Sequence, residues 1–386
     1  MWSLSQDLVH LNHGSFAAVP VEVQEKQSDW RARWEANTTA FILNDYQPAV
    51  DAARNALAPF VGADPQGVVF VRNATAGVAS AVRSMEPLLE PGDELLTTSQ
   101  DYNAIRTILE YAAARTGARV VVADTPFPVP SPDAITAAVV ERVSDHTKLA
   151  VIDHITSPTG LIFPIEEIVD ALEPEVPVVV DGAHAPGQVP LALDGLGATW
   201  YTGNLHKWVC APKGAGFLHT RSDRIDMTVP TIISHGWNQP VPPDGSRYRA
   251  LFDWLGTDDN SAWLTVPEAL RVTGALEPDG WPGLMEKNRA LSLHARDILC
   301  ERLNVAAPAP DVMVGSMAAI PLPDGKGDDP GGLLSPLNYE LLEAGFETMV
   351  MNWPDWPGQL LRVSAHHYNH IDEYSALAEE LIARVG

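Results

Sequence analysis

The chain contains few cysteines and few basic residues. Cys210 and Cys300 are its only cysteines, so neither a disulfide framework nor a cysteine-based metal cluster is expected. Lysine and arginine total 25 against 50 aspartates and glutamates, which gives a formal net charge of −25. This charge repels phosphate backbones and anionic lipids, so we expect no binding to nucleic acid or to a membrane surface. Any anionic ligand would have to be held by local donors.

Long apolar runs and targeting segments are also lacking. No stretch approaches the roughly 20 apolar residues that span a bilayer, and the N-terminus lacks the basic start and apolar run of a signal peptide. Hydrophobic residues still make up 46% of the 386 residues, enough for a sizeable core. The sequence therefore predicts a soluble, cytoplasmic protein with one large domain and one smaller domain.

Between about residues 60 and 220, short valine-rich runs alternate with amphipathic stretches. This alternation is typical of a mostly parallel sheet with helices on both faces. The expected strands are Val68–Val71, Glu94–Thr97, Arg119–Ala123, Leu149–Ile152, Val176–Val180, Ala198–Tyr201 and Gly216–Thr220. The expected helices are Thr75–Ser84, Ala104–Thr116, Asp133–Arg142 and Ile165–Leu172. Ligands bind outside the carboxyl ends of such strands, so the residues after each strand are the candidates for a site.

The pattern changes after residue 220. Residues 229–260, rich in Pro, Gly, Trp and Asp, predict a long ordered loop. The remaining residues predict helices at Pro267–Gly274, Gly283–Leu303 and Ile371–Val385, strands near Ser316–Ile320 and Leu360–Ser364, and a turn-rich Pro321–Gly332. We expect an N-terminal segment at residues 1–20, a large domain at 21–275 and a small α+β domain at 276–386.

Two segments that follow expected strands carry groups suited to an anionic ligand with a cationic ring. Asn73–Gly77 opens a helix with small residues and a threonine, a pattern typical of anion binding through free amides and the helix dipole. The alternative is a plain helix cap at Asn73 or Thr75. Asp181 ends an all-valine strand, where a carboxylate is costly to bury without a cation such as a protonated pyridine nitrogen. The alternative for Asp181 is a cap of the next helix.

A third segment places Lys207 in the largely apolar stretch 204–208. Desolvation lowers the pKa of an ammonium group and makes the amine nucleophilic, as a Schiff base requires. His206 and Lys207 follow Asp181 by 25 and 26 positions. The order of helix start, strand-end aspartate and His-Lys pair favours pyridoxal 5'-phosphate (PLP) as the cofactor.

The chain resembles fold-type I PLP enzymes of the class V aminotransferase group, and within it the isopenicillin N epimerase subgroup. The matching stretches are Leu11–Phe16, Asn73–Gly77, Ser157–Gly160, Val180–Gly187, His206–Trp208 and Arg362–Ser364. They extend over nearly the whole chain. The resemblance implies an α/β fold with a mostly parallel seven-stranded sheet between helices, a smaller α+β C-terminal domain, PLP, and a homodimer with shared active sites.

The resemblance also implies roles for single residues. Lys207 would form the aldimine with PLP and move the Cα proton, Asp181 would pair with the pyridine nitrogen, and Tyr102 would stack on the opposite face of the ring. His184 and Ser157 would lie near the phenolic oxygen. The implied phosphate ligands are Ala74, Thr75, Asn204 and His206, with Thr257 reaching the phosphate of the neighbouring subunit.

Arg362 would bind the carboxylate of an amino-acid substrate, a bidentate task suited to guanidinium, with Asn12 and His13 as further substrate ligands. Two features depart from the group. Asn204 stands where serine is common, although an amide can still donate to phosphate. The loop before Arg362 lacks the cysteine that the cysteine desulfurases of this group use as persulfide acceptor, so that route is not expected.

His366 and His370 have the i,i+4 spacing of a zinc pair on a helix. The preceding strand and Asn369 favour a loop instead, and no third ligand is evident. We therefore expect no metal, and a role in packing or in the substrate pocket for His366, His367 and His370.

The reaction is not determined by these motifs, because PLP makes the Cα carbanion accessible and the protein decides which bond breaks. The resemblance favours a C–S β-lyase acting on an S-conjugated cysteine in a natural-product pathway such as antibiotic biosynthesis. The alternatives are an epimerase with Lys207 and Tyr102 as acid and base on the two faces, a decarboxylating oxidative deaminase, and an aminotransferase. The presence of Lys207, Asp181 and Arg362 disfavours a non-catalytic binding module.

Overall fold

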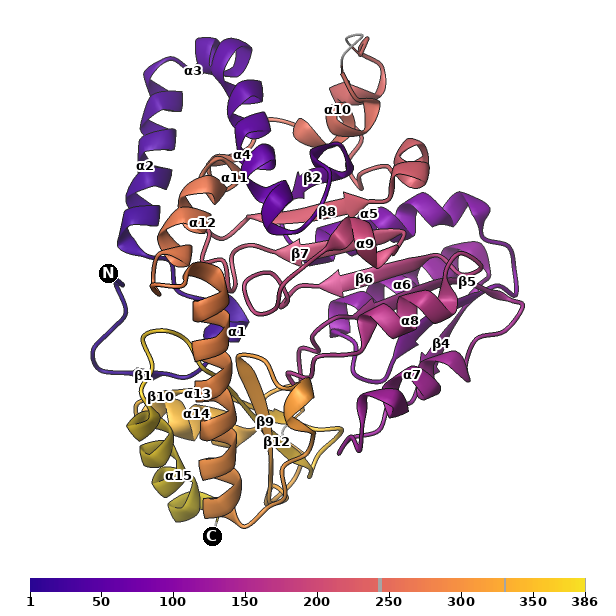
Figure 1. The fold of residues 1–386 in the computed structure, drawn as a ribbon. Coiled ribbons are helices and arrows are strands. Elements are labelled where there is room, and N and C mark those ends of the chain that lie inside the picture. Colours follow the sequence, from indigo (N-terminus) through magenta and orange to yellow (C-terminus); the bar gives the residue numbers. More distant parts are fainter. Residues whose placement is uncertain (242–244, 330, 386) are drawn as a thin grey trace.

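The computed structural model describes residues 1–241, 245–329 and 331–385. A seven-stranded sheet forms its centre, with the strand order β2-β8-β7-β6-β5-β3-β4 (Figure 1). The strand β8 is antiparallel to both of its neighbours, and the other pairs are parallel, which confirms the predicted mostly parallel sheet. The strands are β2 (Val68–Val71), β3 (Glu94–Thr98), β4 (Arg119–Ala123), β5 (Thr147–Asp153), β6 (Val178–Gly182), β7 (Trp200–Asn204) and β8 (Gly216–Thr220).

Helices cover both faces of this sheet because successive strand residues point to opposite sides. In β5, Leu149 and Val151 join one apolar core, while Ala150 and Ile152 join the other. The first core includes α5 (Ala74–Met85) and α6 (Asn103–Thr116), and the second includes α7 (Pro132–Val140) and α8 (Ile165–Leu172). All four helices were predicted. No helix among the described residues is long and apolar enough to cross a membrane.

The N-terminal helices lie outside the predicted alternation. They are α1 (His13–Phe16), α2 (Val21–Ala36), α3 (Thr38–Ala40), a π-helical turn at Phe41–Asp45, and α4 (Tyr46–Phe60). In α2 only Val23 is buried, so its sequence carries little helical periodicity. Shorter elements are α9 (Leu193–Leu196) and the 3₁₀ turns Pro65–Gly67, Glu86–Leu88, Ser222–Met227 and Asp311–Met313.

The prediction of a long ordered loop at residues 229–260 was partly wrong. Within it lie a 3₁₀ turn at His235–Trp237 and the helix α10 (Arg247–Asp253), while residues 242–244 lie outside the described residues. Ser246 caps α10, since its side chain accepts a hydrogen bond from the Arg249 amide. The buried Tyr248 of α10 packs into the sheet core. The surrounding prolines and glycines hide this short helix from a composition-based prediction.

The C-terminal part is built on α13 (Gly280–Leu303), which follows α11 (Ser261–Leu264) and α12 (Val266–Gly274). It contains an antiparallel sheet in the order β11-β12-β9 and the helices α14 (Pro336–Glu343) and α15 (Ile371–Val385). Its strands are β9 (Met317–Leu322), β11 (Met349–Asn352) and β12 (Gln359–Ser364). The predictions of α12, α13, α15, β9 and β12 are confirmed, whereas α14 and β11 were missed. Residue 330, in the predicted turn-rich stretch, lies outside the described residues.

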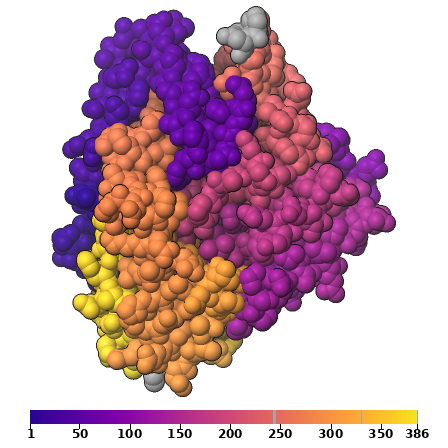
Figure 2. Space-filling model, in the orientation of Figure 1, coloured from indigo at the N-terminus to yellow at the C-terminus, as the bar shows by residue number. Residues whose placement is uncertain are grey.

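The N-terminal segment joins the C-terminal part. The strand β1 (Val9–His10) pairs in parallel with β10 (Phe346–Glu347), and the Ser364 amide donates to the Leu11 carbonyl at 2.7 Å. Figure 2 shows the orange α12–α13 segment with the indigo N-terminal helices above it and the yellow C-terminal segment beside it. The predicted domain boundaries at residues 20 and 275 stay predictions.

Gly77 lets α5 lie directly on the sheet. A Cβ built at Gly77 would lie 2.1 Å from Thr202 Oγ1. Overpacking of a core typically costs about 1–3 kcal/mol. We therefore expect Gly77→Ala to lower the free energy of unfolding by about that amount in urea denaturation. The matched control is Gly195→Ala in α9, where a Cβ meets nothing within 4 Å. Equal effects of the two substitutions would contradict this packing.

Candidate active site

The N-terminus of α5 faces the carboxyl end of β7. Asn73 caps the helix, since its Oδ1 accepts from the Ala76 amide at 2.9 Å, and Asn204 Oδ1 accepts from the Ala74 amide at 2.8 Å. The capping interpretation of Asn73 is therefore confirmed. Among the described residues, the Thr75 amide and hydroxyl have no protein partner. An anion can still bind at this helix start, through Thr75 and the Asn204 amide NH₂ rather than through the Ala74 amide.

His206 lies beside this helix start with one ring nitrogen occupied. Its Nδ1 donates to the Ala215 carbonyl at 3.1 Å. Burial lowers the pKa of His206 to about 4, so the free ring carries a lone pair at Nε2 near neutral pH. Donation from Nε2 to a phosphate requires a second proton, which the negative charge of the phosphate itself favours.

Lys207 is buried beside His184. Its Nζ lies 2.8 Å from His184 Nε2. Burial, and then the nearby Arg362 cation, lower the pKa of Lys207 to about 7. Burial also holds the pKa of His184 well below its ordinary value, so its neutral ring can accept a hydrogen bond from the lysine. The structure thus buries the amine of Lys207 as predicted, and its role as a nucleophile stays a prediction.

Asp181 is a buried acid without a bonded cation among the described residues. Its Oδ1 accepts from the Ala183 amide at 2.9 Å, so it closes a local turn. The alternative of a helix cap was wrong, because the next helix among the described residues begins at Leu193. Burial raises the pKa of Asp181. Asp153 is its partner in register on β5, and burial followed by the charge of Asp181 holds the pKa of Asp153 well above its ordinary value. A protonated ring nitrogen would supply the missing positive charge, so this site fits the pyridine of PLP.

Arg362 on β12 is buried and bound only to neutral groups. Its Nη1 donates to the Ser157 carbonyl at 2.5 Å, and its Nη2 donates to Asn12 Oδ1 at 3.1 Å and to Ser15 Oγ at 2.7 Å. Its Nε has no partner among the described residues. Burial lowers the pKa of Arg362 to about 10, so the group stays charged at neutral pH. A buried guanidinium without a carboxylate partner is a site for an anion such as a substrate carboxylate.

The expected substrate contact of His13 is not what the structure shows. His13 Nδ1 lies 2.9 Å from the Tyr368 hydroxyl, and its Nε2 lies 3.3 Å from the Lys207 carbonyl. Its neighbour Asn12 does reach Arg362, because adjacent residues at the start of α1 point in different directions. Ser15 was missed, although it lies within the matching stretch 11–16.

Two further predicted residues are exposed in the single chain. Tyr102, at the start of α6, is 46% exposed, so its ring is free to cover a ligand. Thr257 is exposed next to Asp258, which forms an ion pair with Arg72 just before the α5 start. The stacking of Tyr102 and the contact of Thr257 with a neighbouring subunit stay predictions.

One further residue near the site, Asp153, was not singled out from the sequence. Asp153 carries the same signal as Asp181, an acid that ends an apolar strand, and could have been found. His366 lies in the loop between β12 and α15, as predicted, but it contacts His13 and Cys210 rather than His370. Nothing in the spacing of these three residues indicates that contact.

The sheet, the anion-binding helix start, the strand-end acid and the desolvated lysine together define a PLP-dependent enzyme of fold type I. Residues 11–377 match the aminotransferase class-V family, and the chain belongs to this family. The cofactor is therefore PLP, as the sequence predicted.

Relatives of this chain include enzymes with different activities. Isopenicillin N epimerase of Streptomyces clavuligerus is 32% identical, over 99% of this chain and 96% of the relative. Putative L-cysteine desulfhydrase 1 of Oryza sativa subsp. japonica is also 32% identical, over 82% of this chain and 67% of the relative. The solved complex of the cystine C–S lyase C-DES with cysteine persulfide has a TM-score of 0.79 at 21% identity, covering 99% of this chain and 98% of that chain. The predicted resemblance to the isopenicillin N epimerase subgroup is confirmed.

The lowered pKa of Lys207 predicts a reactive amine near neutral pH. Because only the deprotonated amine is nucleophilic, the rate of covalent PLP uptake by cofactor-free protein should rise with pH and level off above about pH 7. Borohydride trapping followed by mass spectrometry measures this rate. Arg362→Met removes a neighbouring cation that lowers the pKa, so its profile should shift to higher pH. A wild-type rate that still rises steeply towards pH 10, the ordinary range of lysine, would contradict the desolvated state.

Proposed function

We propose that the protein is a PLP-dependent C–S β-lyase that acts on an S-conjugated cysteine in a natural-product pathway. The observation that carries the proposal is the pair of buried cations, Lys207 and the carboxylate-free Arg362, in one site. Support also comes from relatives named for cleavage at sulfur, among them hercynylcysteine sulfoxide lyase of Schizosaccharomyces pombe, 24% identical over 81% of this chain.

Substrate binding begins with Arg362. The guanidinium is held in place by Ser157, Asn12 and Ser15, which are neutral acceptors that do not cancel its charge. The α-carboxylate of an amino acid can therefore form a charge-assisted pair with it, which a thiol or amine product without that carboxylate cannot do. This contact fixes Cα relative to Lys207.

Proton transfer at Cα falls to Lys207. When bound, PLP supplies an electron sink that stabilises negative charge at Cα. An amine with a pKa of about 7 can accept and return a proton at neutral pH. His184 Nε2, 2.8 Å from Nζ, holds the amine in position without competing for the proton, because its own pKa is well below its ordinary value.

The released sulfur would leave as a free thiol rather than as a protein persulfide. Cys210 is fully buried between His13 and His366, and Cys300 lies in α13 among the apolar residues of the C-terminal part. Neither sulfur contacts Arg362 or Lys207 Nζ among the described residues. The balanced reaction is S-substituted cysteine and water giving pyruvate, ammonia and thiol.

Epimerisation is the second candidate, supported by the 32% identity to isopenicillin N epimerase over 99% of this chain. It needs a proton donor on each face of the planar carbanion. Lys207 would serve one face, and the exposed Tyr102 would serve the other. The decarboxylating deaminase and the aminotransferase use the same lysine, but no observation favours them.

The proposal includes a homodimer with shared active sites and a cytoplasmic location. Thr257 is exposed in the single chain and follows Gly256, whose φ of +128° favours glycine. The resemblance assigns this segment to the phosphate of a neighbouring subunit.

The reaction is tested with a set of S-alkyl and S-aryl cysteine conjugates in deuterated water. We expect pyruvate and free thiol in equal amounts. Deuterium at Cα of intact substrate with inverted configuration would establish the epimerase, and carbon dioxide release with oxygen uptake would establish the deaminase. Tyr102→Phe sharpens the distinction, because it should spare elimination and remove racemisation. The absence of pyruvate with every conjugate would overturn the lyase assignment.

Arg362→Lys tests the carboxylate contact. Lysine keeps the charge but lacks the planar guanidinium that binds a carboxylate through two hydrogen bonds. We therefore expect kcat/KM to fall roughly 30-fold, which corresponds to about 2 kcal/mol, mainly because KM rises. Steady-state kinetics measure the split. Arg289→Lys is the matched control, since Arg289 donates to the carbonyls of Val314 and Asp311 outside the site. An unchanged KM in Arg362→Lys would exclude the assigned role.

A further inference from the structure

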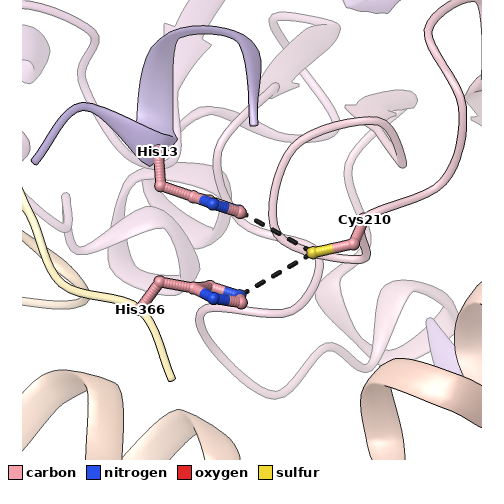
Figure 3. A group of neighbouring side chains, drawn as sticks. All are labelled: His13, Cys210 and His366. Carbon is pink, nitrogen blue, oxygen red and sulfur yellow. Dashed lines mark hydrogen bonds between the residues drawn. The ribbon is translucent and has the colours of Figure 1, made fainter. Parts of the chain in front are cut away.

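A buried cluster of three side chains lies behind the Lys207 turn. His13 comes from α1, Cys210 from the turn after β7, and His366 from the loop after β12 (Figure 3). Cys210 Sγ lies 3.8 Å from His13 Nε2 and 3.7 Å from His366 Nε2. The three potential ligand atoms all lie within 4.8 Å of one another, and all three residues are buried.

These distances suit coordination of one ion. An ion bound at about 2.3 Å from sulfur and about 2.0–2.1 Å from nitrogen holds those atoms roughly 3.6 Å apart. Two imidazoles and one thiolate form a ligand set for thiophilic cations rather than for magnesium or calcium. We propose that His13, Cys210 and His366 bind one such cation, Zn²⁺ or Cu⁺.

The orientation of the rings shows what binding requires. The imidazoles of His13 and His366 stack with centroids 4.0 Å apart and planes inclined by 11°, so both Nε2 atoms face Sγ from one side (Figure 3). Because nitrogen lone pairs lie in the ring planes, one ring must tilt to direct both at a single ion. His366 can tilt without losing a hydrogen bond at Nδ1, since this buried atom has no partner among the described residues.

His13 has the anchor that metal-binding histidines usually have. Its Nδ1 lies 2.9 Å from the Tyr368 hydroxyl, an outer contact that orients the ring. Because a hydroxyl can accept as well as donate, Nδ1 can carry the ring proton when Nε2 binds the ion. The Lys207 carbonyl, 3.3 Å from His13 Nε2, offers a further oxygen if the ion takes a fourth ligand. Binding replaces the thiol proton, so it releases one proton.

The ion would join three segments that each carry a group of the active site. His13 follows Asn12, which contacts Arg362; Cys210 lies three residues after Lys207; and His366 lies four residues after Arg362. An ion here would stabilise the arrangement of these segments without touching the substrate. This site is independent of the proposed reaction, so it stands or fails separately.

The test uses the purified full-length protein loaded with PLP. Zinc is added in one sample and Cu⁺ under anaerobic conditions in another, and native mass spectrometry after gel filtration measures retained ions. We expect one ion per chain and a melting temperature that rises with the concentration of the added ion. Retention of only one metal assigns the site to that metal. No retained ion in either sample would overturn the proposal.

The two cysteines provide a matched pair of variants. Cys210→Ser should lose the ion, with at least a roughly 100-fold weaker affinity, whereas Cys300→Ser should keep it. His366→Asn should lose the ion, and His367→Asn, whose side chain contacts Glu277, should keep it. Equal retention by Cys210→Ser and wild type would contradict the site.

A spectroscopic measurement on the wild-type protein tests the site even if the variants fail to fold. X-ray absorption at the metal edge should show one sulfur and two imidazole nitrogens around the ion. A shell without sulfur would place the ion elsewhere and overturn the assignment.

Discussion

The structure depends on the burial of charged groups that do not pair with one another. Lys207 and Arg362 are buried bases, and Asp181 and Asp153 are buried acids, yet no direct ion pair joins them among the described residues. Burial is the largest cause of the pKa shift of each group. Such an arrangement opposes folding, since each unpaired charge loses hydration. It is complementary to a ligand that carries a ring cation, a phosphate and a carboxylate, which is what PLP with an amino acid presents.

The buried bases and acids do not pair with one another because they lie on different parts of the chain. Asp181 lies on β6 and Lys207 follows the neighbouring strand β7, whereas Arg362 lies on β12 of the C-terminal sheet. The partners of Arg362 on the N-terminal segment belong with that second sheet, because Leu11 and Gly14 bond to Ser364. Arg362 also donates to the Ser157 carbonyl, which follows β5 of the large sheet. The carboxylate site therefore connects the two sheets.

Sequence patterns predicted the parts of the structure that depend on local chemistry. Each of these features can be recognised from a few neighbouring residues: the valine-rich strands, the cap at Asn73 and the apolar surroundings of Lys207. Contacts between distant segments were not visible. The resemblance implied a substrate contact for His13, whereas its ring stacks on His366, more than 350 positions away in the chain. The helix α10 was hidden because its burial comes from the sheet rather than from its own flanking residues.

The site limits the choice among PLP reactions even though Lys207 could serve several of them. Elimination needs a base at Cα, the role proposed for Lys207, and no proton donor on the face that Tyr102 would cover. Epimerisation instead needs a proton donor held rigidly on that face, and Tyr102 has no side-chain hydrogen bond among the described residues to hold it. The proposed elimination therefore requires less of Tyr102 than epimerisation does. A second subunit that fixed the Tyr102 hydroxyl would supply the proton donor that epimerisation requires.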